Sequence, residues 1–395
     1  MLNKNQLKAV MANDRFIFLL AGAGTGKTTV IENRVKRLIK EGHNKMLLIS
    51  FTKKSAESLR RRINTELETV VTSTFHGFCY QALKDIYKLD IVTEDQLLIS
   101  GFTNHEIKEI DCFKRNNQTN YLVKKYNQYL RDNKLFDFTD LEVLMLKKMR
   151  SDKLFSKRIK DSFDYIFIDE FQDTSDIQYE LIKTLKTSTN AFFCVGDPDQ
   201  SIYAFRGASK RVIDLYLKEF KAALYLLDLN YRSSQEIIRL ANNLIKHNDN
   251  RYGKKLVCFI KEKGHIDLKY FKNTEIKNQY ILNEIRLLLN RGIKQEDIAI
   301  LYRNHFVANK LKDCLFETYF ERIQLMTIHQ AKGLEFKVVF MIGMNEEILP
   351  MSQIDIEEER RLMYVGLTRS QRYLYIMVNL ETHQPSRFIL ELFRS

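Results

Sequence analysis

Short apolar runs rich in β-branched and aromatic residues recur along the chain, and helical periodicity follows them. The runs are Phe16–Ala21, Met46–Ser50, Tyr165–Asp169, Ala191–Val195, Ala223–Leu227, Ile298–Leu301, Ile323–Thr327, Val338–Ile342 and Tyr373–Met377. Strands that alternate with helices are typical of doubly wound parallel sheets, and continuous apolarity indicates strands covered on both faces. Because the runs are too many for one ordinary sheet, the pattern predicts an α/β fold of two domains with a boundary near Leu227–Leu229.

The stretch between Tyr80 and Lys134 differs in composition and in the spacing of its apolar residues. Polar and basic residues dominate it, and the apolar positions Tyr121, Tyr126 and Leu130 follow only a helical spacing. This pattern predicts a small helical insertion at residues 80–133. The first domain would then comprise residues 1–79 and 134–228, and the second would comprise residues 229–395.

Composition narrows the classes of partner. Of 395 residues, 63 are Lys or Arg and 50 are Asp or Glu, which gives a net charge of +13 and favours a polyanionic partner. The apolar runs fall far short of the roughly 18 residues of a membrane span, and no signal peptide is evident at the N-terminus. The five cysteines stand far apart, as is typical of reduced thiols. We therefore expect a cytoplasmic protein without a membrane partner.

The strongest local signal is a P-loop-like segment between the first strand and the following helix, with Ala in place of the first glycine of the strict pattern. Glycines allow backbone N–H groups to face phosphate, and the helix N-terminus adds a positive dipole end. We expect Lys27 to reach the β- and γ-phosphates and the Thr28 hydroxyl to hold Mg²⁺. The predicted nucleotide-binding residues are Ala21, Gly22, Ala23, Gly24, Thr25, Gly26, Lys27, Thr28 and Thr29.

A second signal is the acidic pair that ends the apolar run from Tyr165. Ligands bind at the carboxyl ends of strands in open α/β sheets, and this strand delivers Asp169 and Glu170 there. Asp169 suits Mg²⁺, and Glu170 suits a base that orients the attacking water. Such a pair is often merely solvated, but its occurrence with a P-loop predicts hydrolysis of a nucleoside triphosphate.

Further motifs follow these two in a fixed order. They are Phe171-Gln-Asp-Thr174, Val195-Gly-Asp-Pro-Asp-Gln-Ser-Ile-Tyr-Ala-Phe-Arg-Gly207, Leu229-Asn-Tyr-Arg-Ser-Ser234, Met326-Thr-Ile-His-Gln-Ala-Lys-Gly-Leu-Glu-Phe336 and Glu358-Glu-Arg-Arg-Leu-Met-Tyr-Val-Gly-Leu-Thr-Arg369. In this register they resemble the UvrD/Rep family of superfamily 1 DNA helicases. The resemblance extends from Asn3 to about Met377.

The resemblance implies two RecA-like domains with ATP between them and a helical 1B insertion in the first. It also implies roles at the ATP site for residues outside the P-loop. These are Gln6 for reading adenine, Tyr231 for stacking on the base, Gln200 for coupling the γ-phosphate to DNA, Arg232 and Arg369 for clamping the γ-phosphate, and Glu335 for linking the nucleotide and DNA sites.

The same resemblance implies a set of DNA contacts in which aromatic residues are interleaved with basic ones, an arrangement that suits single strands. The set is Phe51, Thr52, Lys53, Thr74, His76, Phe136, Phe138, Tyr203, Phe205, Arg206, Thr327 and His329. Core packing is an open alternative for Phe136 and Phe138, and also for Tyr203 and Phe205. The family usually has Trp at the position of Phe205, so stacking there is expected to be weaker.

One departure from the family concerns the accessory 2B subdomain. Only about 20 residues separate Arg303 from Ile323, where relatives carry that subdomain, so we expect it to be absent. The function that we expect is an ATP- and Mg²⁺-dependent translocase or helicase. The resemblance implies that it moves 3′ to 5′ on single-stranded DNA, and we expect it to act on 3′-tailed duplex DNA. The alternative is a DNA-stimulated ATPase subunit that unwinds weakly alone and serves a nuclease partner, for example in phage defence.

Overall fold

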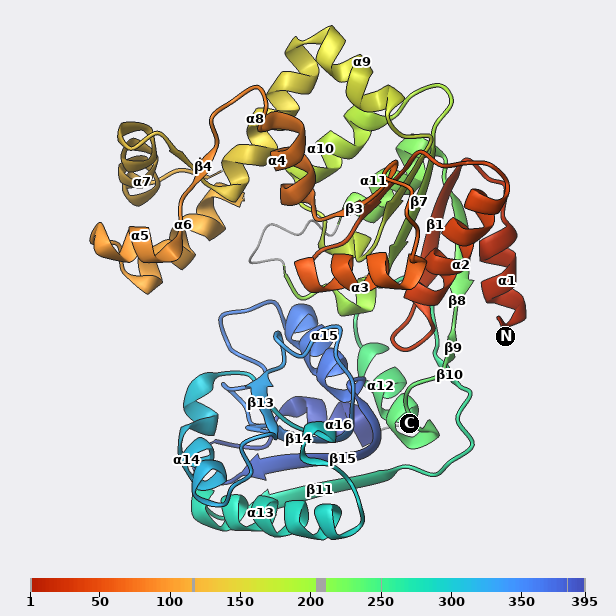
Figure 1. Cartoon of the computed structure of the whole chain (residues 1–395). Helices are drawn as coiled ribbons and strands as arrows, with labels where there is room; N and C mark the ends of the chain where they lie inside the picture. Colours follow the sequence, from red (N-terminus) through yellow and green to blue (C-terminus); the bar gives the residue numbers. More distant parts are fainter. Residues whose placement is uncertain (1, 116–117, 204–210, 250, 382, 394–395) are drawn as a thin grey trace. The chain divides into compact units, whose positions relative to one another are not determined.

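The computed structural model describes residues 2–115, 118–203, 211–249, 251–381 and 383–393 (Figure 1). Internal contacts divide the chain into two compact units. The first comprises Met1–Leu20, Lys27–Asp197 and Tyr203–Leu227, and the second comprises Ala21–Gly26, Pro198–Ile202 and Asp228–Ser395. Two short segments, residues 21–26 and 198–202, thus belong with the residues that follow position 227. The predicted division into a first domain, a helical insertion and a second domain stays a prediction.

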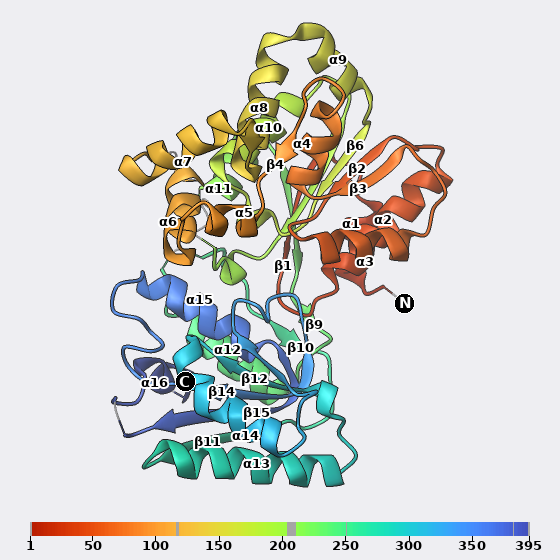
Figure 2. The same ribbon diagram turned by 60° about the vertical axis from the view of Figure 1, so that its left-hand side comes forward.

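The first unit is built on a six-stranded sheet, of which Figure 2 shows several strands side by side. From one edge to the other its strands are β3 (Val70–Ser73), β2 (Met46–Ile49), β6 (Tyr165–Ile168), β7 (Ala191–Gly196), β1 (Phe16–Ala21) and β8 (Ala223–Leu227). The pairings from β3 through β1 are all parallel. The central strands are buried along nearly their whole length because helices cover both faces.

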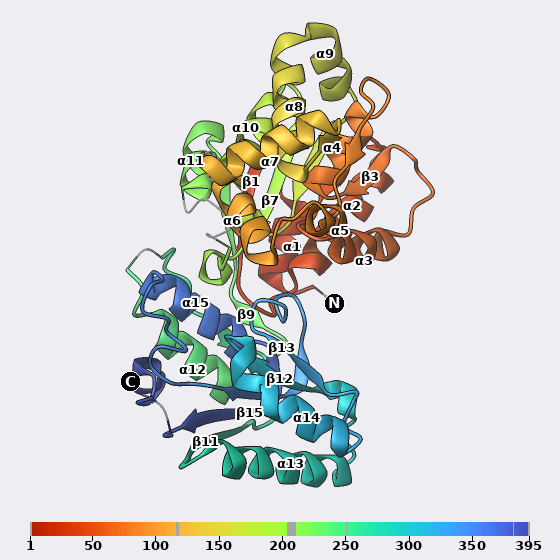
Figure 3. The same ribbon diagram turned by 90° about the vertical axis from the view of Figure 1, so that its left-hand side faces the viewer.

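In Figure 3 this sheet lies between α2 and α3 on one side and α10 and α11 on the other. The helices of the first unit are α1 (Lys4–Met11), α2 (Lys27–Lys40), α3 (Lys53–Ile63), α4 (Phe75–Leu83), α5 (Glu94–Ile99), α6 (Asn104–Arg115), α7 (Tyr121–Asp132), α8 (Phe138–Ser151), α9 (Lys153–Asp161), α10 (Asp176–Leu185) and α11 (Val212–Phe220), with the 3₁₀ turn η1 (Phe171–Asp173). Helices α5, α6 and α7 enclose a small core of their own around Phe102 and Tyr126. Two short strands, β4 (Asp90–Ile91) and β5 (Leu135–Phe136), pair in parallel beside these helices.

The parallel pairing places the carboxyl ends of five strands along one edge of the first sheet. In sheet order, β3 ends before Thr74, β2 two residues before Phe51, β6 before Asp169, β7 before Asp197, and β1 at the P-loop-like segment. Predicted DNA contacts therefore follow β3, β2 and β7, and predicted nucleotide residues follow β6, β7 and β1. This is the edge at which open α/β sheets bind ligands.

The second unit contains a five-stranded sheet whose pairings are again parallel. Its order is β11 (His265–Phe271), β15 (Ser370–Asn379), β14 (Phe336–Ile342), β12 (Ile298–Tyr302) and β13 (Gln324–Thr327). A separate two-stranded ribbon pairs β9 (Leu229–Asn230) with β10 (Val257–Cys258). The remaining elements are α12 (Gln235–Ile245), α13 (Thr274–Asn290), α14 (Asn309–Glu317), α15 (Ile356–Leu367), α16 (Arg387–Phe393) and the 3₁₀ turns η2 (Pro198–Gln200), η4 (Gln295–Asp297) and η5 (His305–Ala308).

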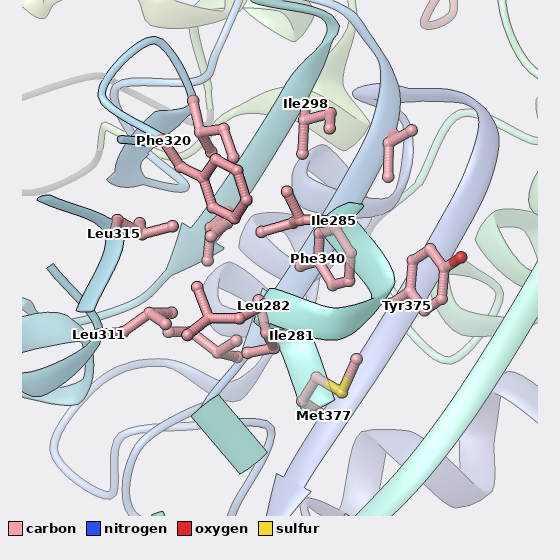
Figure 4. Close-up of a cluster of buried hydrophobic side chains, with 14 of the residues drawn as sticks. Ile281, Leu282, Ile285, Ile298, Leu311, Leu315, Phe320, Phe340, Tyr375 and Met377 are labelled. Atoms are coloured by element: carbon pink, nitrogen blue, oxygen red, sulfur yellow. The ribbon is translucent and has the colours of Figure 1, made fainter. Parts of the chain in front are cut away.

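Alternate residues of these strands point to opposite faces of the second sheet. Ile298, Ile300, Phe340 and Tyr375 belong to one cluster, which α13 and α14 complete with residues such as Ile285, Leu311 and Leu315 (Figure 4). The rings of Phe340 and Tyr375 stack at 4.4 Å. The intervening positions of β12, of residues 338–342 in β14 and of the second half of β15 are equally buried, so apolar side chains cover both faces there and these strands read as continuous apolar runs.

The fold class predicted from the sequence is confirmed, since both units are α/β with parallel sheets, and all nine predicted runs form strands. Two strands of the main sheets were not predicted. β3 is short and only half-buried, and β11 carries His265, Asp267 and Lys269 at alternate positions. The region predicted to be purely helical also contains β4. These strands lie at sheet edges or in small ribbons, where less burial is needed and the apolar signal is weaker.

Candidate functional site

The P-loop-like segment runs from the last residue of β1 to the first turn of α2. Gly24 and Gly26 have φ angles of 65° and 82°, in the left-handed region that favours glycine. A Cβ atom on Gly24 would lie 2.6 Å from both Cβ of Arg232 and Nδ2 of Asn230. Glycine at position 24 is thus required by the backbone conformation and by the close approach of two side chains.

Hydrogen bonds fix the shape of this loop. The hydroxyl of Thr25 donates to the carbonyl of Gly22 at 2.8 Å, and Nδ2 of Asn230 donates to the carbonyl of Ala23 at 2.6 Å. The backbone N–H of Tyr231 donates to the carbonyl of Gly24 at 2.9 Å. These bonds engage the loop's carbonyl oxygens, which are the groups that would repel a phosphate.

Lys27, in the first turn of α2, faces the acidic end of β6. Its Nζ atom lies 3.2 Å from both carboxylate oxygens of Glu170. Burial acts to lower the pKa of Lys27, but the charges of Glu170, Asp169 and Asp197 outweigh it and raise that pKa. Lys27 is therefore a firmly protonated cation held against carboxylates, as the compensation of phosphate charge requires.

Asp169 and Glu170 have unequal environments. Burial, followed by the neighbouring Glu170 carboxylate, raises the pKa of Asp169 to about 7 against the opposing effect of Lys27. Oδ1 of Asp169 accepts the backbone N–H of Glu170 at 2.9 Å, and Glu170 itself adopts a left-handed φ of 52°. A non-glycine residue in this conformation is uncommon and is often found at functional sites.

Sequence reasoning assigned no role to Gln172 or Asp197, which lie in the same cluster. Nε2 of Gln172 donates to Oε2 of Glu170 at 2.6 Å, and its Oε1 accepts the backbone N–H of Asp197 at 2.9 Å. Both residues are buried. Gln172 thus links the ends of β6 and β7 and orients the Glu170 carboxylate. The sequence signal that could have identified Gln172 is an amide side chain two residues after the acidic pair.

The structure brings together Gln200 and Arg369, two residues with predicted roles at the γ-phosphate. Nη2 of Arg369 donates to Oε1 of Gln200 at 3.1 Å. Arg369 is only 1% exposed, and its other nitrogens donate to the carbonyls of Val365 and Leu334. The guanidinium is therefore held in a defined orientation beside Gln200.

Arg232 and Glu335 also meet, at a distance of 2.6 Å between Nε and Oε2. Glu335 comes directly before β14 and Arg369 directly before β15, and these strands pair, so both residues stand at the amino edge of the second sheet. The ring of Tyr231, the predicted base-stacking residue, packs 4.8 Å from that of Phe259. Phe259 was not predicted as a site residue, although it is 59% exposed.

Gln6 caps the helix on which it lies. Its Oε1 accepts the backbone N–H of Asn3, and its own N–H donates to Oδ1 of Asn3. This reciprocal capping box fixes the start of α1 and holds the Gln6 amide in a buried position. Its predicted contact with adenine stays a prediction.

Two of the predicted DNA-contacting aromatics stack on each other in the first unit. The rings of Phe51 and Tyr203 are 5.1 Å apart and inclined by 17°. The neighbouring Thr52 caps α3 by accepting the N–H of Ser55, and Lys53 is exposed at the start of that helix. The predicted contacts Phe205 and Arg206 lie outside the described residues.

A second aromatic pair joins His76 and Phe138, whose rings lie 4.8 Å apart. Nε2 of His76 is 3.0 Å from the buried carboxylate of Glu142, and Thr74 caps the helix that carries His76. Phe138 is 46% exposed, which argues against core packing for this residue. DNA contact by these residues stays a prediction.

Phe136, by contrast, is half-buried and lines a surface pocket of about 660 Å³. The basic residues Arg131, Lys134 and Lys147 line the same pocket. In the second unit, Thr327 ends β13 and exchanges hydrogen bonds with Gln330, and His329 follows it in a half-buried position. Both regions offer polar or basic groups beside predicted DNA contacts.

The donors predicted for Mg²⁺ are the Asp169 carboxylate and the Thr28 hydroxyl. These hard oxygen ligands have the chemistry that Mg²⁺ prefers, and Mg²⁺ commonly takes only one or two protein ligands together with phosphates and water. Among the described residues, no cluster of three or more His, Cys, Asp or Glu side chains could hold a metal ion. Within the same residues, we find no helix with the length and apolarity needed to cross a membrane.

Comparison with known families covers nearly the whole chain. The model of the UvrD/REP helicase N-terminal domain matches residues 2–108 and 96–221. The model of the UvrD-like helicase C-terminal domain matches residues 225–322 and 312–381. The two matches meet near the place where the chain passes from the first unit to the second.

Individual relatives carry related names. A probable DNA helicase of Mycoplasma pneumoniae is 30% identical, and the alignment covers 98% of this chain and 86% of that protein. The ATP-dependent DNA helicases Rep of Buchnera aphidicola and PcrA of Bacillus subtilis are each 31% identical over 80% of this chain. Those alignments cover 56% of Rep and 49% of PcrA, so the chain matches only about half the length of these two relatives.

Proposed function

Because this chain belongs to the UvrD/REP helicase family, we propose that it is an ATP-dependent DNA helicase that moves 3′ to 5′ along single-stranded DNA. The observation that carries the proposal is the cluster at the edge of the first sheet, where Lys27 contacts Glu170 beside Asp169. In this cluster, a cation that can neutralise phosphate charge lies beside carboxylates that can hold Mg²⁺ and activate water.

We propose that Lys27 exchanges its contact with Glu170 for the β- and γ-phosphate oxygens when ATP binds. Glu170 would then be available to accept a proton from the attacking water, and Gln172 would hold one of its oxygens in place. Asp169 and Thr28 would hold Mg²⁺, which when bound neutralises charge on the phosphates. The buried position of Gln172 between β6 and β7 supports this arrangement.

The second unit would sense the state of the nucleotide. Gln200 and Arg369 are hydrogen-bonded to each other, so a movement of one side chain would be transmitted to the other. We propose that Arg232 and Arg369 stabilise charge on the γ-phosphate, as an arginine finger does. Glu335 would connect this event to the DNA contacts through its ion pair with Arg232.

Single-stranded DNA is the proposed track. Exposed or half-buried aromatics follow the strands beside the nucleotide residues, and stacking on such rings does not depend on base sequence. The net charge of +13 supports phosphate binding. Neither the contacts of the described residues nor the names of the relatives favour the alternative of a nuclease-associated subunit. A cytoplasmic location stays a prediction.

We propose that this chain translocates efficiently but separates long duplexes poorly on its own. Between Arg303 and Ile323, where an accessory subdomain was expected to be missing, the described elements are η5 and α14. The two matched pieces of the C-terminal family model overlap within this region, at residues 312–322. Separating DNA strands costs roughly 1.4 kcal/mol of stacking per base pair. The two units would have to supply this free energy without the accessory subdomain, so we expect unwinding to be weak.

Streptavidin displacement from end-labelled oligonucleotides tests the proposal. A 3′ to 5′ motor displaces streptavidin faster from a 5′-biotin than from a 3′-biotin, and only when ATP is present. Equal rates at both ends, or displacement independent of ATP, would contradict the proposed movement. Efficient single-turnover unwinding of a long 3′-tailed duplex would contradict the separate proposal that unwinding is weak.

A further inference from the structure

Cationic side chains of the second unit surround the short segment Pro198–Ile202. Nζ of Lys332 donates to the carbonyl of Gln200 at 2.8 Å, and Nε of Arg361 donates to the carbonyl of Ser201 at 3.0 Å. Arg369 donates to the side chain of Gln200. Two more cations, Arg251 and Lys254, contact Asp199, and the proposed function gives them no role.

Asp199, Arg251 and Lys254 form a compact triad. Nε and Nη2 of Arg251 each donate to one carboxylate oxygen of Asp199 at 2.9 Å, and Nζ of Lys254 lies 3.2 Å from the carboxylate. Asp199 and Lys254 are each only 4% exposed. Burial acts to raise the pKa of Asp199, but Lys254 and Arg251 outweigh it and hold that pKa below its usual value.

The segment that carries the two cations is firmly anchored. Nη2 of Arg251 donates to the carbonyl of Lys254, and the side chain of Asn242 on α12 bonds both the N–H and the carbonyl of Leu256. The next residues form β10, which pairs with β9. Asn230 of β9 in turn donates to the carbonyl of Ala23 in the P-loop-like segment.

The same segment packs directly on that loop. A Cβ atom placed on Gly22 would lie 2.3 Å from Cδ2 of Leu256 and 3.5 Å from Cδ of Lys254. Residues 251–256 thus contact the first glycine of the loop through their apolar atoms, and they hold the residue next to Gln200 through their charges. They form a short connection between the phosphate-binding loop and the residue next to Gln200.

We propose that Arg251 and Lys254 are positioning residues that hold Gln200 through Asp199 and so couple the nucleotide to DNA. This inference rests on the proposed DNA-dependent ATPase. A buried ion pair generally contributes little net stability relative to apolar packing of the same volume. The triad is therefore better explained by the position that it fixes than by the stability that it adds.

The test compares neighbouring lysines. Lys254→Met removes the buried charge while retaining a similar shape, and Lys255→Met removes the same charge from the adjacent, exposed position. Asp199→Asn removes the carboxylate charge without changing its size. For each variant and the unsubstituted chain, the measurements are kcat and KM for ATP with and without single-stranded DNA, and the unfolding temperature.

The proposal predicts that Lys254→Met and Asp199→Asn each lower DNA-stimulated kcat by about tenfold. KM for ATP and DNA-free turnover should stay within about twofold, and the double variant should lose no more than either single one. Lys255→Met should behave like the unsubstituted chain. Equal losses with and without DNA in step with a lower unfolding temperature, or no loss at all, would overturn the proposal.

If Lys254→Met does not fold, the variant Arg251→Lys tests the proposal at the partly exposed end of the triad. It keeps the charge but loses the two-pronged contact, and the proposal predicts a selective loss of DNA stimulation that is absent in Lys255→Met. An unsubstituted chain that shows no DNA stimulation would instead contradict the proposed function. The two failures are thus distinguishable in one set of assays.

Discussion

The acidic edge of the first unit and the cation-rich surroundings of residues 198–202 in the second unit have opposite charge balances. In the first, the carboxylates of Asp169, Glu170 and Asp197 all act on a single cation, Lys27. In the second, one carboxylate and three uncharged oxygens of residues 199–201 accept bonds from five cations, and a further carboxylate, that of Glu357, lies 3.6 Å from one of them, Arg361. Those cations are Arg251, Lys254, Lys332, Arg361 and Arg369.

The difference indicates a division of labour. An excess of carboxylates suits the binding of a divalent cation and the activation of water. An excess of cations around a segment with a single carboxylate suits the detection of phosphate charge, because gain or loss of that charge shifts the whole set of hydrogen bonds. Substitutions at the acidic edge should therefore abolish chemistry, whereas substitutions around residues 198–202 should weaken its dependence on DNA.

The largest effect is expected from Glu170→Gln. Loss of the general base should lower ATP turnover by about 10²–10⁴-fold while ATP and DNA still bind. Pre-steady-state hydrolysis and filter binding measure the two properties separately. Glu180→Gln, which removes a carboxylate from a surface ion pair with Lys183, is the matched control. Turnover of Glu170→Gln at the unsubstituted rate would show that another residue is the base.

Lys27→Ala should reduce turnover by about 10²–10³-fold because an electrostatic partner of the phosphates is lost. It also removes the ammonium that opposes the raised pKa of Asp169, so that pKa should rise further above about 7. Steady-state kinetics across pH, with nucleotide affinity measured in parallel, check both effects. A normal kcat in Lys27→Ala would show that Lys27 does not act in ATP hydrolysis.

Gln200→Ala is expected to act on coupling. Without the amide that bonds Arg369, DNA-stimulated turnover should fall by about tenfold, with a smaller change in DNA-free turnover. Gln128→Ala, at an exposed position on α7, serves as the control. Equal losses of turnover with and without DNA would show that Gln200 acts in hydrolysis itself. The two regions would then not differ in function as proposed.

The smallest effect on ATP turnover is expected for the predicted DNA-contacting aromatics of the first unit, whose loss should change DNA affinity instead. Phe51→Ala should weaken single-strand affinity by about 1–3 kcal/mol and leave DNA-free ATPase nearly unchanged. Fluorescence anisotropy with a labelled oligonucleotide measures the change, and Tyr121→Ala, which removes an 82% exposed aromatic, is the control. Normal affinity of Phe51→Ala would indicate that its stack with Tyr203 serves packing only.

The sequence predicted the architecture well because buried parallel strands leave long apolar runs. Every such run from Phe16–Ala21 to Tyr373–Met377 forms a strand, and the motifs fix which strand ends carry chemistry. The half-buried β3 and the polar β11 were missed for the same reason, since an edge position does not demand continuous apolarity.

Contacts between side chains far apart in the sequence could not be predicted from the spacing of residues. Arg251 and Asp199 are 52 residues apart, and no local pattern indicates that they form a two-pronged ion pair. Gln172 lay within a recognised motif, but its bridge to Asp197 depends on the adjacency of β6 and β7. Such contacts follow from strand order, which the sequence pattern alone leaves open.

In the proposed mechanism, DNA controls ATP hydrolysis by this chain. The most direct measurement is the steady-state rate of ATP hydrolysis by the unsubstituted protein as a function of single-stranded DNA concentration. We expect a saturable rise of about tenfold or more. A rate that stays the same from zero to saturating DNA would contradict it.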